Sequence, residues 1–129
     1  MNKLKNKLQQ LVNEYVRKRD THNGYARCIS CGKIMKAGTF HAGHYYAAGK
    51  YENLRFDLDN IHAQCVQCNY YEHGNLIQYR ENLIAKIGLE RVKKLDMKAA
   101  YYRRHGHKWD DFTLNIMIQD IKEKLNGQQ

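Results

Sequence analysis

Two cysteine pairs with the same spacing constrain this chain more than any other feature. Cys28 and Cys31 form the first pair, Cys65 and Cys68 form the second, and residues 32–64 lie between them. Two C-x2-C pairs converge naturally on one tetrahedral thiolate site, which is the usual form of a structural zinc site. We therefore predict that the four cysteines bind one structural Zn²⁺, which stabilises the fold and does no chemistry.

Disulfide bonds are the alternative explanation of four cysteines, and they would allow three pairings. The chain begins with no charged-then-apolar signal, so we expect it in the cytoplasm, where thiols stay reduced. The segment between the pairs is longer than in a compact zinc ribbon. We therefore expect further structure to be inserted between the two zinc knuckles.

The length and charge of the chain limit its organisation and its partners. Its 129 residues suit one domain, which we divide into an N-terminal helix (1–22), a zinc-stapled core (23–75) and C-terminal helices (76–129). Lys and Arg number 22 against 13 acidic residues, giving a net charge of +9. That balance favours a nucleic acid over a membrane, because no long apolar run is present.

Apolar residues at helical spacing predict helices on both sides of the cysteine-rich region. The first covers residues 3–19, a second begins at a cap on Asn75 and ends at Gly88, and a short helix around residues 89–95 follows. The basic and aromatic stretch 101–108 either lies along a phosphate backbone or forms a solvated turn. The basic residues that we predict to contact phosphates are Arg17, Lys18, Arg19, Arg103, Arg104 and Lys108.

The first helix and the last helix, which Asp111 or Thr113 caps, each carry an apolar stripe. The simplest explanation of such a stripe is core packing, and the alternative is a surface for a partner. A symmetric dimer formed through these stripes would supply two equivalent sites, so we predict a homodimer.

The segment between the cysteine pairs combines a hairpin with a helix. Residues 39–46 and 53–56 are predicted to pair as two strands, and a helix from Val66 is predicted to carry Asn69 and His73 one turn apart on one face. An amide oxygen and an imidazole on one helix face suit Mg²⁺ or Mn²⁺, and they would also take Zn²⁺ or Ni²⁺.

His44 is the residue that we choose as general base for hydrolysis of a phosphodiester. A neutral imidazole can take a proton from water near pH 7. Asn60 is expected to fix the hairpin or to orient the His44 ring. His62 is expected to be structural and to donate to a backbone carbonyl, whereas His22, His105 and His107 are expected to be ordinary surface or packing residues.

The order of these residues resembles the HNH (ββα-metal) nucleases. The matching elements are Gly43-His44, Asp59-Asn60 and Cys65-Val-Gln-Cys68-Asn69. A zinc-stapled form with Asn directly after the last cysteine is similar to the phage endonuclease VII group. The chain also resembles the lambdoid phage NinG (Rap) recombination family, through Cys28-Ile-Ser-Cys31, Ala-Gly-His44-Tyr, Asn53-Leu-Arg-Phe56, His62-Ala-Gln-Cys65-Val-Gln-Cys68-Asn69 and Gly74-Asn75.

This resemblance implies an α+β fold, with a small ββα-metal, treble-clef-like core, a structural zinc on four cysteines, and flanking N- and C-terminal helices. It also implies a metal-dependent, structure-selective endonuclease for branched DNA such as Holliday junctions, encoded by a phage or prophage and acting in the bacterial host cytoplasm. Within it His44 would be the general base, Asn60 the middle residue of the motif, and Asn69 and His73 the ligands of a catalytic Mg²⁺ or Mn²⁺.

One position departs from the HNH pattern, which usually has an acidic or histidine ligand directly before the base. Gly43 stands there in this chain, and His41 is the obvious substitute. Successive residues of a strand face opposite sides, so His41 can reach the metal only if Gly43 allows a bulge or kink. Asp57 and Asp59 are the acidic alternatives.

A binding module is the rival to the enzyme. A zinc-knuckle protein that holds nucleic acid without cutting it would bind through Lys and Arg in a strongly salt-dependent way. Such a protein needs neither His44 nor Asn69, so these two residues separate the two hypotheses.

Overall fold

Two small antiparallel sheets and four α-helices make up the part of the chain that the structure, a computed structural model, describes, residues 2–128. The fold is therefore a mixture of helices and short sheets, as the sequence predicts. The strands pair as β1 with β2 and β3 with β4. In chain order the elements are α1 (Lys3–Asp20), β1 (Tyr25–Arg27), β2 (Ile34–Lys36), β3 (His41–His44), β4 (Ile61–Gln64), α2 (Leu76–Ile87), α3 (Leu89–His105) and α4 (Asp111–Asn126).

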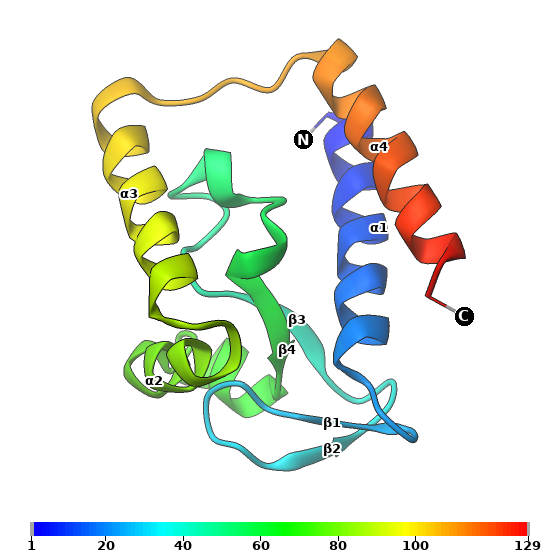
Figure 1. The fold of residues 1–129 in the computed structure, drawn as a ribbon, viewed down its shortest axis with the longest axis vertical. Coiled ribbons are helices and arrows are strands. Elements are labelled where there is room, and N and C mark those ends of the chain that lie inside the picture. The colour runs from blue at the N-terminus through cyan, green and yellow to red at the C-terminus, as the bar shows by residue number, and fades with distance from the viewer. Residues whose placement is uncertain (1, 129) are drawn as a thin grey trace.

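Helices α1 and α4 lie side by side on one side of the molecule (Figure 1). Val12 and Val16 of α1 pack in one buried cluster with Leu114 and Ile118 of α4, and Phe56 and Ile61 complete that cluster from the middle of the chain. The two apolar stripes that motivated the homodimer prediction therefore cover each other within one chain. Burial of this surface against water supplies their stabilisation without a partner.

Sheet β3–β4 lies between this helix pair and the pair formed by α2 and α3 (Figure 1). Tyr79 and Leu83 of α2 pack with Val92 and Leu95 of α3 in a second buried cluster, which also holds Leu54. All four residues of β4 are buried, so this strand is covered on both faces. No helix within residues 2–128 is both long and apolar enough to span a membrane.

The pairing partner of the strand that carries His44 differs from the prediction. His41–His44 pairs with Ile61–Gln64, whereas residues 53–56 belong to the 3-10 helix Glu52–Leu54 and the turn that follows it. A strand buried on both faces shows no alternation of polar and apolar residues, so it has no period-two pattern to detect. The sequence Ile61-His-Ala-Gln64 therefore carries no local indication of a strand.

Two helix ends also differ from the prediction. Helix α3 extends to His105 and is 17 residues long, because no glycine or proline interrupts it before Gly106, whose φ is 68°. The basic stretch that begins at Tyr101 is thus helical as far as His105. Helix α4 is capped by Asp110, whose carboxylate accepts the Thr113 N–H at 2.7 Å, one residue before the earlier of the two predicted caps.

A pair of isoleucines on α4 tests the packing of α1 against α4. Ile118 is 2% exposed and Ile116 is 48% exposed. We expect Ile118→Ala to lower the free energy of unfolding by about 3 kcal/mol, because it leaves a cavity in the core. The same substitution at Ile116 should cost less than about 1 kcal/mol. Urea unfolding measures both, and equal losses would contradict the packing described here.

Candidate metal centre and hydrolytic site

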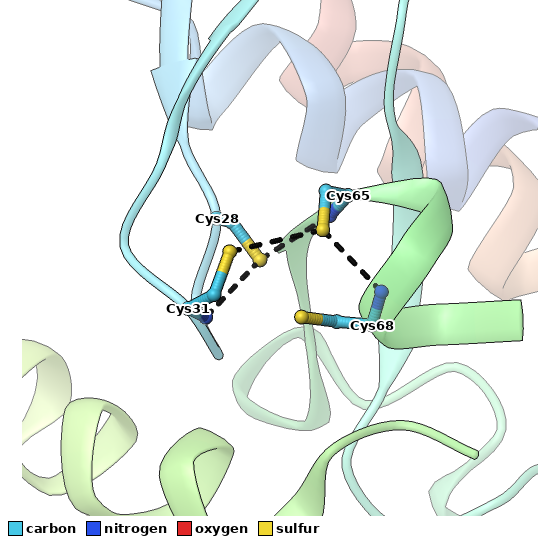
Figure 2. Close-up of side chains that lie close together, drawn as sticks. All are labelled: Cys28, Cys31, Cys65 and Cys68. Carbon is cyan, nitrogen blue, oxygen red and sulfur yellow. Dashed lines mark hydrogen bonds between the residues drawn. The ribbon is translucent and has the colours of Figure 1, made fainter. Parts of the chain in front are cut away.

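The four cysteines meet at one point, although they come from two distant segments. Cys28 and Cys31 lie on the loop between β1 and β2, and Cys65 and Cys68 lie at the end of β4 and in the π-helix Gln67–Tyr71 that follows it (Figure 2). Their sulfur atoms all lie within 4.8 Å of one another. The Sγ atoms of Cys31 and Cys65 are 3.8 Å apart, and a Zn–S bond of about 2.3 Å gives about 3.8 Å along each tetrahedral edge. The cluster is positioned to bind one metal ion and has the dimensions of a zinc site.

Backbone N–H groups point at the cluster and stabilise its negative charge. Cys65 and Cys31 donate N–H groups to the Cys28 sulfur at 3.3 and 3.5 Å, and the Cys68 N–H donates to the Cys65 sulfur at 3.3 Å. Burial by itself raises the pKa of the Cys28 thiol. The hydrogen bonds from backbone N–H groups outweigh burial, so the pKa falls to about 7. Burial and the neighbouring sulfur atoms raise the pKa of Cys68 to about 12. A divalent cation removes this mutual repulsion, so the donor set fits a metal ion.

A separate hollow gathers three of the residues predicted to do chemistry. It has a volume of about 580 Å³, and His44, Asn69 and His73 all line it. His44 comes from the end of β3, Asn69 from the π-helix and His73 from the turn that follows. The pairing of β3 with β4 therefore brings His44 to the same cavity as Asn69 and His73, which lie 25 or more positions further along the chain.

The His44 ring is oriented by the backbone carbonyl of Arg55. The Nε2 atom lies 2.8 Å from that oxygen. Because a carbonyl can only accept, Nε2 carries the hydrogen and Nδ1 keeps its lone pair. Burial lowers the pKa of His44, and the nearby Arg55 charge lowers it further although the carbonyl bond opposes the change. The ring is therefore neutral at pH 7 and offers a free basic nitrogen.

His41 reaches Asn69 and does not line the hollow. Its Nδ1 atom lies 2.8 Å from the Asn69 Nδ2 atom. Strand β3 pairs with β4 residue by residue from His41 to His44, so the bulge that was required to bring His41 onto the metal does not form. Within residues 2–128, the cysteines make the only group of three or more His, Cys, Asp or Glu side chains close enough to share an ion.

His73 does not lie on a common helix face with Asn69. The π-helix ends at Tyr71, and His73 has a φ of 50°. The chain turns there because the Gly74 N–H donates to the Cys68 carbonyl at 2.8 Å, which closes the segment back on the cysteine cluster. His73 is exposed and still lines the hollow, so it joins Asn69 through a turn and not through helical spacing.

Asn60 fixes the connection between β3 and β4, and its side-chain hydrogen bonds go to groups other than the His44 ring. It is fully buried, its Oδ1 accepts the Tyr46 N–H at 2.8 Å, and its Nδ2 donates to the carbonyls of Tyr46 and Leu54. Of the two roles expected for this residue, the structure supports the first. Asn75 occupies the N-cap position of α2 as predicted, but its side chain makes no capping hydrogen bond, and its amide donates to the Cys68 sulfur at 3.5 Å.

Gly43 is required by a close approach of Gln64. A Cβ atom on Gly43 would lie 1.9 Å from the Gln64 Oε1 atom. Gln64 cannot easily move, because it is fully buried and its amide nitrogen, Nε2, donates to the Ser30 hydroxyl at 2.9 Å and the Gly74 carbonyl at 2.6 Å. The departure from the HNH pattern at this position therefore has a steric cause. The sequence contains no local indication of this contact, which joins two strands.

The acidic alternatives to His41 are engaged elsewhere. Asp57 pairs with Lys98 at 2.7 Å, and Asp59 pairs with Arg91 of the same helix, α3. Neither carboxylate lines the hollow. His62 has the structural role expected of it, because its Nε2 donates to the Asp59 carbonyl at 2.8 Å.

The basic residues predicted to contact DNA lie in different surroundings. The Arg19 guanidinium donates to the Leu58 and Ile61 carbonyls and pairs with Asp20, so we assign it a structural role. Lys18 is exposed and Arg17 is half-buried on α1. Arg103, at the end of α3, donates to the Tyr51 hydroxyl at 2.9 Å and so adjoins the hollow. Arg104 and Lys108 are exposed.

The fold and the cysteine cluster define a small α+β protein with four cysteines positioned to bind a metal ion. Residues 1–126 match the sequence model of the family described as "Bacteriophage Lambda NinG protein". The chain therefore belongs to the NinG family.

Several phage proteins share much of this sequence. "Protein ninG" of Escherichia phage lambda is 41% identical over 117 residues, which cover 91% of this chain and 53% of the relative. The proteins of the same name from Escherichia phage 933W and Salmonella phage P22 are 42% and 38% identical over 91% of this chain, covering 54% and 53% of their own lengths. The chain thus spans about half the length of the curated relatives it matches. No solved structure matches the chain.

Metal removal tests the cysteine cluster. We expect native mass spectrometry to find one zinc ion per chain, and we expect a chelator to abolish the cooperative thermal unfolding transition, because metal binding contributes directly to folding free energy. Cys28→Ser should lose both the ion and the transition, and the chelator should then have no further effect. Two disulfides and no bound metal in the purified protein would contradict this account.

Two glycines in the same part of the chain test the close approach at Gly43. We expect Gly43→Ala to lower the free energy of unfolding by about 3 kcal/mol or more, because the new methyl group displaces Gln64 from its buried hydrogen bonds. Gly49 has no heavy atom within 4 Å of a built Cβ, so Gly49→Ala should change stability by less than about 1 kcal/mol. Chemical denaturation of both variants measures the difference, and a neutral Gly43→Ala would refute the contact.

Proposed function

We propose that this chain is a divalent-metal-dependent, structure-selective DNA endonuclease that cuts branched DNA, such as a Holliday junction, in phage recombination. The observation that carries the proposal is the hollow that His44, with its ring already oriented, lines together with Asn69 and His73. Hydrolysis of a phosphodiester needs a base for the attacking water and a cation for the developing charge. The hollow offers groups suited to both tasks.

His44 is the general base in this proposal. Its Nδ1 lone pair takes a proton from the attacking water, while Nε2–H remains bonded to the Arg55 carbonyl. The lowered pKa keeps the imidazole in its neutral, proton-accepting form at pH 7. The carbonyl bond also holds the ring in one orientation, so no conformational freedom is lost when the substrate binds.

Asn69 and His73 would hold the catalytic Mg²⁺ or Mn²⁺. Such an ion neutralises charge on the phosphoryl oxygens, and it commonly binds through few protein ligands together with phosphate oxygens and water. His41 is a positioning residue in this account. It accepts the Asn69 amide N–H at 2.8 Å, which leaves the Asn69 carbonyl oxygen as the donor for a cation.

The DNA backbone would be held by basic side chains on two helices. Arg17 and Lys18 of α1, and Arg103 and Arg104 at the end of α3, contribute to the net charge of +9. Lys108 follows α3. In this proposal Zn²⁺ occupies the four-cysteine site and only supports the fold.

A four-way junction needs two cuts, so we propose that two chains act together on it as a homodimer. The stripes of α1 and α4 are buried within each chain, and a dimer would therefore use another surface. Sedimentation of one chain per junction at micromolar protein would contradict the dimer.

A non-catalytic zinc-knuckle protein that binds nucleic acid is the second candidate. The observation that favours it is the lack, within residues 2–128, of a second group of three His, Cys, Asp or Glu side chains placed to share an ion. Such a protein would hold DNA through its basic surface and would be indifferent to the loss of His44.

A nuclease assay with paired histidine variants decides between the two candidates. We expect the wild type to nick a four-way junction in Mg²⁺ or Mn²⁺ and His44→Ala to be at least about 100-fold slower, because the base is missing. His105→Ala is the control, since His105 is exposed and lies outside the hollow. If wild type and His44→Ala bind the junction equally and neither cuts it with any divalent ion, the endonuclease proposal fails.

A further inference from the structure

The hollow beside His44 is larger than hydrolysis of a phosphodiester requires. It holds about 580 Å³. A phosphate group, an ion and a few waters occupy on the order of 200 Å³ at about 30 Å³ for each water-sized group. More than half of the hollow therefore extends beyond the groups that would react, and its remaining walls have a composition of their own.

Three tyrosines form those walls and are held in place by bonds through their hydroxyl groups. The Tyr46 hydroxyl donates to Asp96, the Tyr45 hydroxyl accepts from Arg80 at 3.1 Å, and the Tyr51 hydroxyl accepts from Arg103. The ring centroids of Tyr45 and Tyr46, and those of Tyr46 and Tyr51, are 4.9 Å apart. These side chains are thus fixed before any ligand arrives.

The segment that joins the tyrosines leaves the hollow open and adds positive charge. Ala47 and Ala48 line it with methyl groups only, and Lys50 lines it with an exposed ammonium group that makes no ion pair within residues 2–128. A rigid aromatic wall with a cation beside it fits a flat, uncharged ring that is attached to a phosphate. That is the chemistry of a nucleotide.

We propose that this part of the hollow binds one unstacked DNA base adjacent to the phosphate that is cut, a role that rests on the proposed endonuclease function. The base stacks on the tyrosine wall, with Tyr51 as its main aromatic contact on the ring face opposite the Arg103 guanidinium, which lies 5.7 Å from the Tyr51 ring centroid. Lys50 contacts the neighbouring phosphate. A base inside a continuous duplex must first be unpaired and unstacked to enter, whereas a base at a branch point or bulge is already free. The site therefore favours branched or bulged DNA because such DNA offers an unpaired base. It needs no contact that recognises the branched backbone itself.

Fluorescence of a base analogue tests this site without any cutting. We would place 2-aminopurine, which stacking quenches, at the unpaired position of a bulged duplex, and in a second DNA at a fully paired position, with no Mg²⁺ or Mn²⁺ added. Wild type should quench the unpaired probe and bind the bulged DNA more tightly. Ala48→Phe, which fills the hollow, and Tyr51→Leu, which removes the ring, should each weaken that binding about tenfold and abolish the quenching. Ala48→Phe, which leaves the bond between Arg103 and the Tyr51 hydroxyl intact, should leave duplex binding unchanged.

Matched variants separate stacking from general disturbance. Tyr51→Phe keeps the ring and its packing against Tyr46, so it should retain the quenching that Tyr51→Leu abolishes. Ala37→Phe makes the same substitution as Ala48→Phe at an exposed position outside the hollow, and it should also behave as wild type. Zinc content and the thermal midpoint identify any variant that is misfolded. If Ala48→Phe or Tyr51→Leu is misfolded, the other variant alone decides whether the base site exists.

The outcomes distinguish this site from the proposed function. If Ala48→Phe and Tyr51→Leu bind and quench as wild type does, or if wild type quenches neither probe, the base site is wrong, even where wild type cuts junctions in Mg²⁺. If the wild type quenches the unpaired probe and the variants do not, the base site stands, even where no divalent ion supports cutting.

Discussion

The meeting of four sulfur atoms is the constraint on which the rest of this structure depends. Cys28 and Cys31 sit on the β1–β2 loop, and Cys65 and Cys68 follow β4, so a shared ion would lock these two segments together. The lock continues into the backbone, because the Ile29 N–H donates to the Ala63 carbonyl and the Gly74 N–H to the Cys68 carbonyl. A chain of this size gains much of its rigidity from such a staple.

The hollow follows from that staple through a short series of buried contacts. Gln64, directly before Cys65, passes under Gly43 and donates to the Gly74 carbonyl, so the end of β3 and the turn after the π-helix are held against one side chain. Tyr79 of α2 donates its hydroxyl to the Gly43 carbonyl at 2.6 Å from the other direction. His44 and His73 flank these contact points, which explains how they line one cavity although neither lies in a rigid helix.

The sequence predicts the parts of this arrangement that depend on local spacing. Local patterns mark the cysteine pairs, the amphipathic first helix and the helix end at Gly88, and the structure contains all three. The carbonyl partner expected for a structural His62 is also present. Features that depend on distant partners could not be predicted. The strand Ile61–Gln64 is buried on both faces and shows no alternation, Gly43 is explained only by a glutamine on another strand, and Arg19 is a basic helix residue whose partners lie about 40 positions away. The turn at His73 arises from a π-helix, which has no reliable pattern in one sequence.

Location of the catalytic ion tests the central claim most directly. Crystals of the zinc-loaded His44→Ala protein with a four-way junction, grown in Mn²⁺, would be measured for anomalous scattering at the manganese and zinc edges. The account predicts zinc within the four-cysteine cluster and manganese in the hollow, within bonding distance of Asn69 or His73, with a backbone phosphate bound to it beside the position of residue 44. Manganese only at unrelated sites, with the junction bound away from the hollow, would contradict it.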